Sequence, residues 1–241
     1  MRNLYFFLVL ICSVLLSGCK LDDQWEQMGM DSESLSSLAL VNAYSGSQAL
    51  SMYLDDREFT YESKPLLFRD YFPYRNILPG ERNITIFQAS SSSKPVELYA
   101  AKEFFKPGVL YSIFVTGNNK VELLKLEDEV YKSTDGTPKL RVINLSTAQK
   151  EVLIKGLPWE SKGLRLTQKE YTEFHKMNPA SPSTLYLSPG NGTGEQQASL
   201  ELERNGVYSL ILLDNNEPSD NAPRSNSAHQ GALDYILITH L

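Results

Sequence analysis

Hydrophobic and polar residues alternate with a period of two in many short segments after Leu38. These segments are rich in β-branched and aromatic residues and are separated by Gly, Pro or Asn, which is the pattern of strands that bury one face. The clearest of them are residues 84–87, 96–99, 109–115, 121–123, 140–142, 184–187, 200–202, 207–213 and 235–241. Residues 168–177 are the best candidate for a helix, and they would form either a short helix or an irregular strand. Many short strands at this spacing predict an all-β fold of the β-sandwich type.

Parts of this pattern recur in the second half of the chain. The matching stretches are residues 41–45 with 143–146 and residues 105–114 with 203–211. A repeat of about 100 residues is too long for a solenoid and is typical of tandem domains. We therefore expect two tandem immunoglobulin-like or β-sandwich units, at residues 38–133 and 138–241.

The N-terminal residues 1–18 have the features of a secretory signal peptide. Arg2 provides a positive start, and residues 4–16 form an apolar run that is shorter than the roughly 20 residues needed to span a membrane. The run ends in Leu16-Ser17-Gly18-Cys19, which resembles the bacterial lipobox. The resemblance implies that Cys19 becomes the first residue of the mature protein and carries acyl chains, which together give stable anchoring. An ordinary secretory signal followed by an unrelated Cys is the alternative.

The residues from Cys19 onwards indicate a location. Residues 19–37 are polar and rich in Ser and Glu, as expected for a lipidated, flexible tether. Lys20-Leu21-Asp22-Asp23 resembles the export signal that directs lipoproteins of Bacteroidota-type bacteria to the outer face of the outer membrane. The resemblance implies a protein of the cell outer membrane that faces the exterior and contacts membrane lipid through acylated Cys19. A solvated start of the tether is the simpler explanation, because short address signals recur by chance.

Charge and cysteine content exclude several classes of function. Without residues 1–18, which carry one Arg, the net charge is 22 − 29 = −7. Such an acidic chain lacks the clustered Lys and Arg that neutralise nucleic-acid phosphates, so we expect no nucleic-acid partner. Cys12 leaves with the signal peptide and Cys19 is modified, which leaves no thiol for a disulfide, a metal site or a nucleophile.

Several motifs in the first half of the chain together resemble a known family. They are Val41-Asn42-Ala43, Leu50-Ser51-Met52-Tyr53-Leu54-Asp55, Tyr71, Tyr74-Arg75-Asn76-Ile77-Leu78-Pro79-Gly80, Ile84-Thr85-Ile86 and Gly108-Val109-Leu110-Tyr111-Ser112. This set is similar to the domain-of-unknown-function family 4397, which occurs in cell-envelope lipoproteins of Bacteroidota-type bacteria. The resemblance covers most of residues 38–130 and fades in the second unit. It implies a hairpin turn at Pro79-Gly80 and a strand with a core tyrosine, and it carries no activity.

No motif for catalysis or metal binding stands out. The chain has no Gly-x-Ser-x-Gly elbow, and its three histidines, His175, His229 and His240, are far apart and are best explained as surface or strand-end residues. The acidic run at residues 127–129 lacks the alternation and central Gly of a calcium loop, so we expect a solvated strand end there. The paired carboxylates of a glycoside hydrolase leave no sequence signature, and that activity stays open as the less favoured alternative. We expect no enzyme, no cofactor and no metal.

One segment has the composition of a binding surface, because it combines aromatic residues with arginine, the preferred anchors of such surfaces. The candidate ligand-binding residues are Phe68, Arg69, Tyr71, Phe72, Tyr74 and Arg75. Tyr71 and Tyr74 also suit the core, as the family pattern implies. The sequence thus predicts a lipid-anchored, non-catalytic module for binding or envelope assembly. Its partner would be either a glycan held by exposed aromatic residues or another envelope protein docked on a sheet edge.

Overall fold

The computed structural model describes residues 35–45, 47–61, 64–90, 94–178, 182–190, 194–215 and 233–240. The expected signal peptide, Cys19 and most of the expected tether lie outside these residues. The described residues form strands, turns and bends and contain no helix. Accordingly, no helix in this part of the chain is long and apolar enough to cross a membrane.

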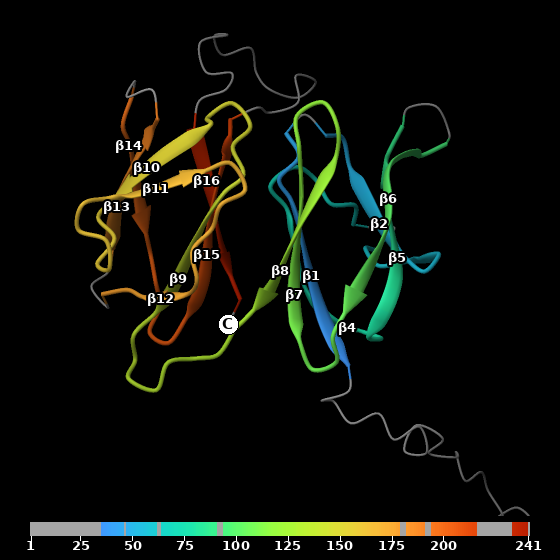
Figure 1. Ribbon diagram of the computed structural model, residues 1–241, viewed down its shortest axis with the longest axis horizontal. Coiled ribbons are helices and arrows are strands. Elements are labelled where there is room, and N and C mark those ends of the chain that lie inside the picture. The colour runs from blue at the N-terminus through green and yellow to red at the C-terminus, as the bar shows by residue number, and fades with distance from the viewer. Residues whose placement is uncertain are drawn as a thin grey trace, which may run out of the picture.

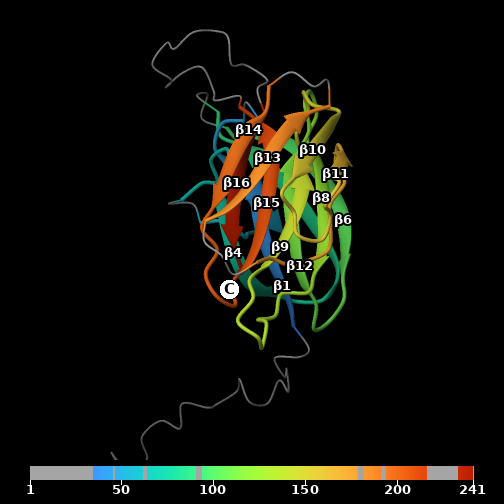
Figure 2. The same cartoon turned by 90° about the vertical axis from the view of Figure 1, so that its left-hand side faces the viewer.

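Sixteen strands follow one another in the described part of the chain. They are β1 (Ser36–Asn42), β2 (Leu50–Leu54), β3 (Arg57–Glu58), β4 (Tyr71–Ile77), β5 (Gly80–Gln88), β6 (Val96–Phe105), β7 (Leu110–Thr116), β8 (Glu122–Asp128), β9 (Lys139–Asn144), β10 (Glu151–Lys155), β11 (Leu164–Thr167), β12 (His175–Lys176), β13 (Ser183–Pro189), β14 (Gln196–Leu200), β15 (Val207–Asp214) and β16 (Leu233–Thr239). They assemble into four sheets with the orders β3-β2-β5-β6, β4-β1-β7-β8, β12-β9-β15-β16 and β11-β10-β13-β14. The sheets stack as four layers in this sequence (Figure 1). Figure 2 shows the stack from the side of β10, β11, β13 and β14, which form one of its two outer layers.

The two halves of the chain have the same topology. Each strand of the first two sheets has its counterpart eight strands later, at the same place in the other two sheets. In both halves the first strand pairs in parallel with the seventh, β1 with β7 and β9 with β15. The fold class expected from the sequence is therefore confirmed: the chain is all-β and consists of two tandem β-sandwich units. We call β1–β8 the first unit and β9–β16 the second unit.

In each sandwich, alternate residues of the outer strands pack into a core between the two sheets. In the first unit, Met52 and Ile86 of the outer sheet pack in one buried cluster with Leu40 and Ile113 of the inner sheet. Each such side chain contributes roughly 1.5–3 kcal/mol by leaving water. The expected core tyrosine is Tyr111, which belongs to this cluster. Because successive side chains of a strand point to opposite faces, the neighbours of the buried residues in the outer sheet face solvent.

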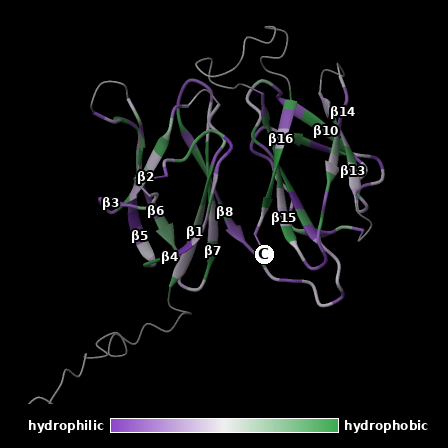
Figure 3. Cartoon of the chain, turned by 180° about the vertical axis from the view of Figure 1, so that it is seen from behind, coloured by the Kyte–Doolittle hydropathy of each residue, from purple (hydrophilic) through white to green (hydrophobic). Residues whose placement is uncertain are grey.

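The central strands of the inner sheets, β1, β7, β9 and β15, are buried almost throughout on both faces. β15 is buried at every position, which is typical of a strand covered on both sides. On the faces turned away from the sandwich cores, Val41 and Phe114 of the first unit form one cluster with Ile143 and Ile211 of the second unit. Figure 3 shows hydrophobic residues along β15 and β16, whereas the end of β8 is hydrophilic. The interface between the units is therefore apolar with a polar spot at the end of β8.

Two local expectations are settled by the strand pairing. Residues 168–177 form the irregular strand of the two alternatives, with a single bridge at Tyr171 and the two-residue strand β12. The hairpin expected at Pro79-Gly80 is wrong, because β4 and β5, which this turn connects, belong to different sheets. Gly80 has a φ of 96°, a conformation that suits Gly, and it turns the chain from the inner sheet into the outer one.

Candidate functional site

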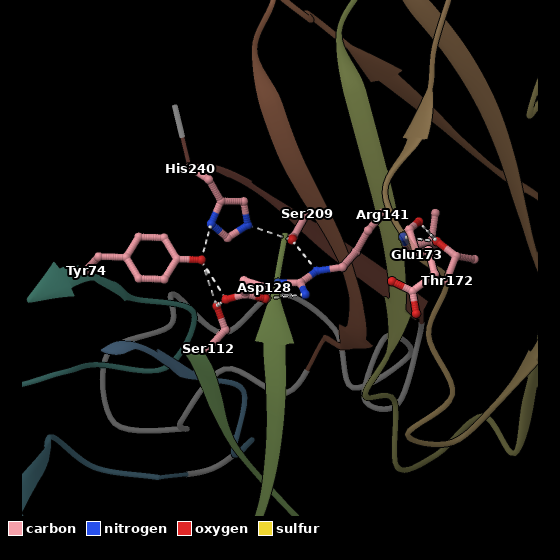
Figure 4. A network of polar contacts seen from close by, with 9 residues as sticks. Tyr74, Ser112, Asp128, Arg141, Thr172, Glu173, Ser209 and His240 are labelled. Carbon is pink, nitrogen blue, oxygen red and sulfur yellow. Dashed lines mark hydrogen bonds and ion pairs between the residues drawn. The ribbon is translucent and has the colours of Figure 1, made fainter. Parts of the chain in front are cut away.

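A polar network crosses the interface between the two units (Figure 4). Its members are Tyr74 (β4), Ser112 (β7) and Asp128 (β8) of the first unit and Arg141 (β9), Ser209 (β15) and His240 (after β16) of the second unit. Burying a polar group lowers the stability of the fold unless the group forms hydrogen bonds inside the protein. The bonds within this network therefore decide how well the two units hold together.

Hydrogen bonds connect five of these side chains into a closed ring. Arg141 Nη1 lies 2.5 Å from Asp128 Oδ1, and Arg141 Nε donates to Ser209 Oγ over 2.8 Å. Ser209 Oγ lies 2.7 Å from His240 Nε2, and His240 Nδ1 lies 3.2 Å from the Tyr74 hydroxyl. The Tyr74 hydroxyl closes the ring by donating to Asp128 Oδ2 over 2.6 Å. Two of these contacts, Arg141 to Asp128 and His240 to Tyr74, join one unit to the other.

The ring fixes the positions of its protons. Tyr74 has one hydroxyl proton and gives it to Asp128, so His240 Nδ1 is the donor in the contact with Tyr74. Nε2 of a neutral His240 then accepts from the Ser209 hydroxyl. The donors thus point one way from Arg141 through Ser209, His240 and Tyr74 to Asp128, and Arg141 also donates directly to Asp128. This order assigns to His240 the neutral form with its proton on Nδ1.

Burial and charge shift the pKa values around the ring. The side chains of Arg141 and Asp128 are 3% and 0% exposed. Burial, reinforced by Arg141 and opposed by Asp128, lowers the pKa of His240 from 6.5 to about 4. Burial and the Asp128 carboxylate raise the pKa of Tyr74 far above its usual value, and they raise the pKa of Tyr71 to about 12. At neutral pH the network thus holds one ion pair, a neutral imidazole and neutral phenols.

The guanidinium of Arg141 contacts an aromatic side chain and has one nitrogen without a hydrogen-bond acceptor. Its Nη2 is buried without a hydrogen-bond partner, and the guanidinium lies over the Phe174 ring, 4.6 Å from the centroid. Val142 N donates to Thr172 Oγ1, which donates to the Glu173 carbonyl (Figure 4). These bonds fix the backbone that carries Phe174. A buried cation gains from such a ring, so the position of Phe174 contributes to the stability of the interface.

The repeat shows which residue distinguishes the second unit in this network. Ala39 pairs with Ser112 in the parallel ladder of the first unit, and Arg141 pairs with Ser209 in that of the second unit. Ala39 and Arg141 therefore occupy matching positions, as do the two serines. The difference between Ala and Arg at this position gives the interface its buried cation.

A serine beside a histidine also occurs in nucleophilic catalysis, but this pair is closed to substrates. Ser209 is 0% exposed, and its Oγ is held between Arg141 and His240. A nucleophile must reach the atom that it attacks. We therefore assign the network a role in joining the units.

A hollow of about 530 Å³ lies on the outer face of the outer sheet of the first unit. Ser51, Tyr53, Thr85, Phe87 and Glu97 line it, together with the ends of the neighbouring loops. These residues alternate with the core residues of β2 and β5, which explains why their side chains face solvent. We call it the aromatic hollow.

Two aromatic rings shape this hollow. Tyr53 and Phe87 lie 5.3 Å apart between centroids and meet edge to face at 82°. In the strand register Tyr53 is opposite Thr85 and Ser51 is opposite Phe87, so the two rings are diagonal neighbours on one face. Neither residue is among the ligand-binding candidates predicted from the sequence. The signal was present, because aromatic residues stand where an outward position of a strand is usually polar.

A second hollow, of about 570 Å³, lies beside the first at the β2–β3 hairpin. Arg57, Arg75 and Arg82 line it together with Asp55 and Glu58. Several apolar residues complete its wall, among them Leu78 at its rim, which is 49% exposed. We call it the arginine hollow. It gathers three guanidinium groups in an acidic chain.

Four of the six ligand-binding residues predicted from the sequence face the second unit. Phe68 and Tyr71 pack against the apolar cluster between the units, and Tyr74 belongs to the ring. Arg69 forms an ion pair with Asp234 of β16 over 2.6 Å. For Tyr71 and Tyr74 the structure therefore shows contacts with neighbouring residues, as in the core alternative.

The remaining two candidates lie elsewhere. Phe72 is 5% exposed and belongs to the core of the first unit. Arg75 is exposed at the arginine hollow, where its Nη1 donates to the Phe59 carbonyl over 2.6 Å and its guanidinium lies 4.9 Å from the centroid of Tyr61. Ligand binding by this segment stays a prediction, and Arg75 is the member that is placed to take part in it.

The acidic run and the histidines give a mixed result. The solvated strand end expected at residues 127–129 is wrong for Asp128, because the carboxylate of this residue pairs with Arg141 in the interface. His240 does follow the end of a strand, His175 stacks on Trp159 at 4.7 Å, and His229 lies outside the described residues. Among the residues that the structure describes, no three His, Cys, Asp or Glu side chains gather to hold a metal ion.

Comparisons with known proteins give one family and two similar structures. The family model DUF4397, a domain of unknown function, matches residues 36–155, which span the first unit and the strands β9 and β10. No curated protein sequence matches the chain. The chain is similar to a family-26 carbohydrate-binding module of Amy13K from Eubacterium rectale, solved with maltoheptaose, at 10% identity over 73% of this chain and 91% of that one, with a TM-score of 0.27. It is also similar to a Bacteroides fragilis protein provisionally described as a cell adhesion protein, at 9% identity over 85% and 97% of the two chains, with a TM-score of 0.22. At these TM-scores neither similarity supports a functional conclusion.

Proposed function

We propose that this chain, which belongs to the DUF4397 family of domains of unknown function, is a non-catalytic binding protein that holds a glycan in the aromatic hollow of its first unit. The observation that carries the proposal is the edge-to-face pair of Tyr53 and Phe87 on a solvent-facing sheet. Flat aromatic rings pack against the C–H faces of sugar rings, and a few polar groups around them set the orientation.

The polar groups of the hollow suit this ligand class. Ser51 and Thr85 place hydroxyls beside the rings, and Glu97 adds a carboxylate. Hydroxyls both donate and accept, and a carboxylate accepts, so together they match the hydroxyls of a sugar. The core of the sandwich does not need the two aromatic rings, because Met52 and Ile86 fill it from the same strands.

Replacing Tyr53 or Phe87 with Ala is expected to weaken glycan binding about five- to thirtyfold, the effect of removing an aromatic anchor worth about 1–2 kcal/mol. The measurement is affinity electrophoresis of the chain from Gln24 onwards through gels that contain different polysaccharides. This chain keeps every described strand and all three apolar clusters, which lie between residues 36 and 239.

The matched control is Tyr186→Ala, which removes a tyrosine that is 41% exposed in the outer sheet of the second unit. We expect this variant to migrate like the wild type. Equal retardation of the Tyr53, Phe87 and Tyr186 variants would locate the ligand elsewhere. Absence of retardation in every gel would favour the envelope-assembly alternative, and release of reducing sugar would favour the hydrolase.

The proposal includes the location of the module. We place it on the exterior of the cell outer membrane, held by acyl chains on Cys19. The support is the lipobox-like stretch at residues 16–19 and the export-like stretch at residues 20–23. A glycan-binding face held at the membrane by this anchor would sample polysaccharides near the cell surface.

Replacing Cys19 with Ser is expected to move the protein from the membrane fraction to a soluble or unprocessed form, because the acyl chains supply the anchor. The measurement is fractionation of cells together with the mass of the N-terminal peptide. A variant that stays in the membrane fraction at its normal processed mass would exclude the lipid anchor. The control is Cys12→Ser, which alters the expected signal peptide without touching the lipidation site.

A further inference from the structure

The aromatic hollow and the arginine hollow meet at one hairpin, and we propose that together they select an acidic glycan. A neutral sugar would occupy the aromatic hollow, and the carboxylate or sulfate of a neighbouring sugar would occupy the arginine hollow. This inference rests on the proposed function, since it names the class of glycan that the same face takes.

The β2–β3 hairpin brings the hollows together. Tyr53 and Asp56 line the aromatic hollow, while Asp55 and Arg57 line the arginine hollow. Asp55 and Asp56 have φ values of 50° and 64°, as in the tight two-residue turns that join adjacent strands. Two adjacent residues thus line the two hollows, Asp56 the aromatic one and Asp55 the arginine one, and we infer that one chain of sugars can reach both.

The side chain of Asp55, in the turn of the hairpin, holds the hairpin in place. The Asp55 carboxylate accepts from Asn83 N over 2.9 Å and from Arg82 Nη1 over 3.0 Å. Arg82 also donates to the carbonyls of Leu78 and Pro79. Asp55 and Arg82 therefore neutralise each other and form the fixed wall of the arginine hollow, and neither of them needs a ligand.

The other two arginines have donors to spare. Arg57 is exposed, and its backbone pairs with Leu54 in the β2–β3 ladder, whereas its guanidinium forms no hydrogen bond or ion pair with a described residue. Arg75 donates from Nη1 to the Phe59 carbonyl, and its guanidinium lies among the rings of Phe59, Tyr61 and Phe72, which hold it at the hollow. A guanidinium whose plane is set by aromatic rings is prepared to donate two parallel bonds to a carboxylate or sulfate.

The charge balance differs between the hollows. The arginine hollow has three guanidinium groups against the carboxylates of Asp55 and Glu58, a net charge of 3 − 2 = +1 in a chain of net charge −6. The aromatic hollow contains the carboxylates of Asp56 and Glu97 and no cation among its lining residues. An acidic sugar is thus repelled from the aromatic hollow and attracted to the arginine hollow. The face distinguishes an acidic glycan from a neutral one and also fixes the direction in which it lies.

The test uses pairs of polysaccharides that share a backbone and differ in charge. They are hyaluronan with its carboxyl methyl ester, and unsulfated chondroitin with carboxyl-methylated chondroitin. In the charged member of each pair a neutral sugar alternates with an acidic one. Affinity electrophoresis of the chain from Gln24 onwards is expected to show at least about tenfold tighter binding to the charged member of a pair, the effect of one charge-assisted contact. Raising the salt concentration is expected to reduce this preference.

Arg57→Gln and Arg75→Gln are each expected to abolish most of the preference for the charged member and to leave the binding of neutral polysaccharides unchanged. The Arg57 guanidinium has no partner among the described residues, so its variant separates binding from stability. The matched control is Arg204→Gln, which removes an exposed arginine of the second unit and is expected to keep the preference.

The outcomes separate this inference from the function on which it rests. Equal binding of charged and uncharged members, or a preference that Arg57→Gln leaves intact, would overturn the selection of an acidic glycan. If binding still depended on Tyr53 in that case, the proposed function would stand. Absence of binding to every polysaccharide would overturn both.

Discussion

Replacing Arg141 with Met is expected to lower the free energy of unfolding by about 3–5 kcal/mol, the usual effect of breaking a buried ion pair from one side. The Asp128 carboxylate would lose the guanidinium that lies 2.5 Å away, and its side chain is 0% exposed, so water cannot take the place of the cation. Met fills the space of the side chain as far as the Nε position and removes the guanidinium that lies over Phe174. The loss would therefore come chiefly from the charge and its contacts.

The measurement is urea unfolding of the single variant and of the double variant Asp128→Asn with Arg141→Met. The double variant is expected to lose less than the single one, because it no longer buries an unpaired charge. The control is Arg165→Met, which breaks an ion pair with Glu151 whose partners are 59% and 36% exposed, and a change below about 1 kcal/mol is expected there. A similar loss in Arg141→Met and Arg165→Met would contradict the role of the ring in joining the units.

The fold could be predicted because each sandwich is encoded in local patterns. Residues 84–87 alternate, and they form part of an outer strand, β5. Residues 207–213 are a nearly continuous apolar run, and they form most of β15, an inner strand covered on both faces. This difference between alternating and continuous runs indicates which sheets face each other. The partner that covers an inner strand is not encoded locally, so the interface between the units could not be assigned.

The same limit explains the candidate site. Tyr71 and Tyr74 are three residues apart, so a regular strand would place them on opposite faces, but the register of β4 against β1 shifts between them and both face the second unit. The sequence shows neither this irregularity nor whether an outward position meets solvent or a second unit. Asp128 was expected in water for the same reason, although its partner Arg141 stands only thirteen residues later across the junction. Sequence reasoning identifies outward residues. The tertiary arrangement decides which of them become a binding face and which become an interface.

Acid is expected to weaken the interface through His240. The pKa of this imidazole is 6.5 in the unfolded chain and about 4 in the folded protein, chiefly because of burial. Since the folded protein disfavours the charged form, the contribution of His240 is complete above pH 6.5, declines as the pH falls towards 4 and does not fall further below that. The difference between the two values corresponds to about 3 kcal/mol.

The hydrogen bonds of the ring explain why protonation of His240 is unfavourable. A proton on Nε2 would turn this atom into a donor towards Ser209 Oγ, which already receives the N–H of Arg141, so the Ser209 hydroxyl would lose its acceptor. The new positive charge would also lie beside Arg141. Tyr71 and Tyr74 stay neutral throughout this pH range and cannot compensate.

The measurement is the free energy of unfolding in urea at pH 7.0, 6.0 and 5.0 for the wild type and for His240→Gln. The glutamine side chain donates and accepts but does not titrate in this range. The wild type is expected to lose stability over these pH values by up to about 1.4 kcal/mol per pH unit more than the variant does. His175 and the surface carboxylates are common to both proteins, so the difference in slope isolates His240. Parallel profiles would mean that His240 takes up its proton in the folded protein without loss, and the directed ring would then be wrong.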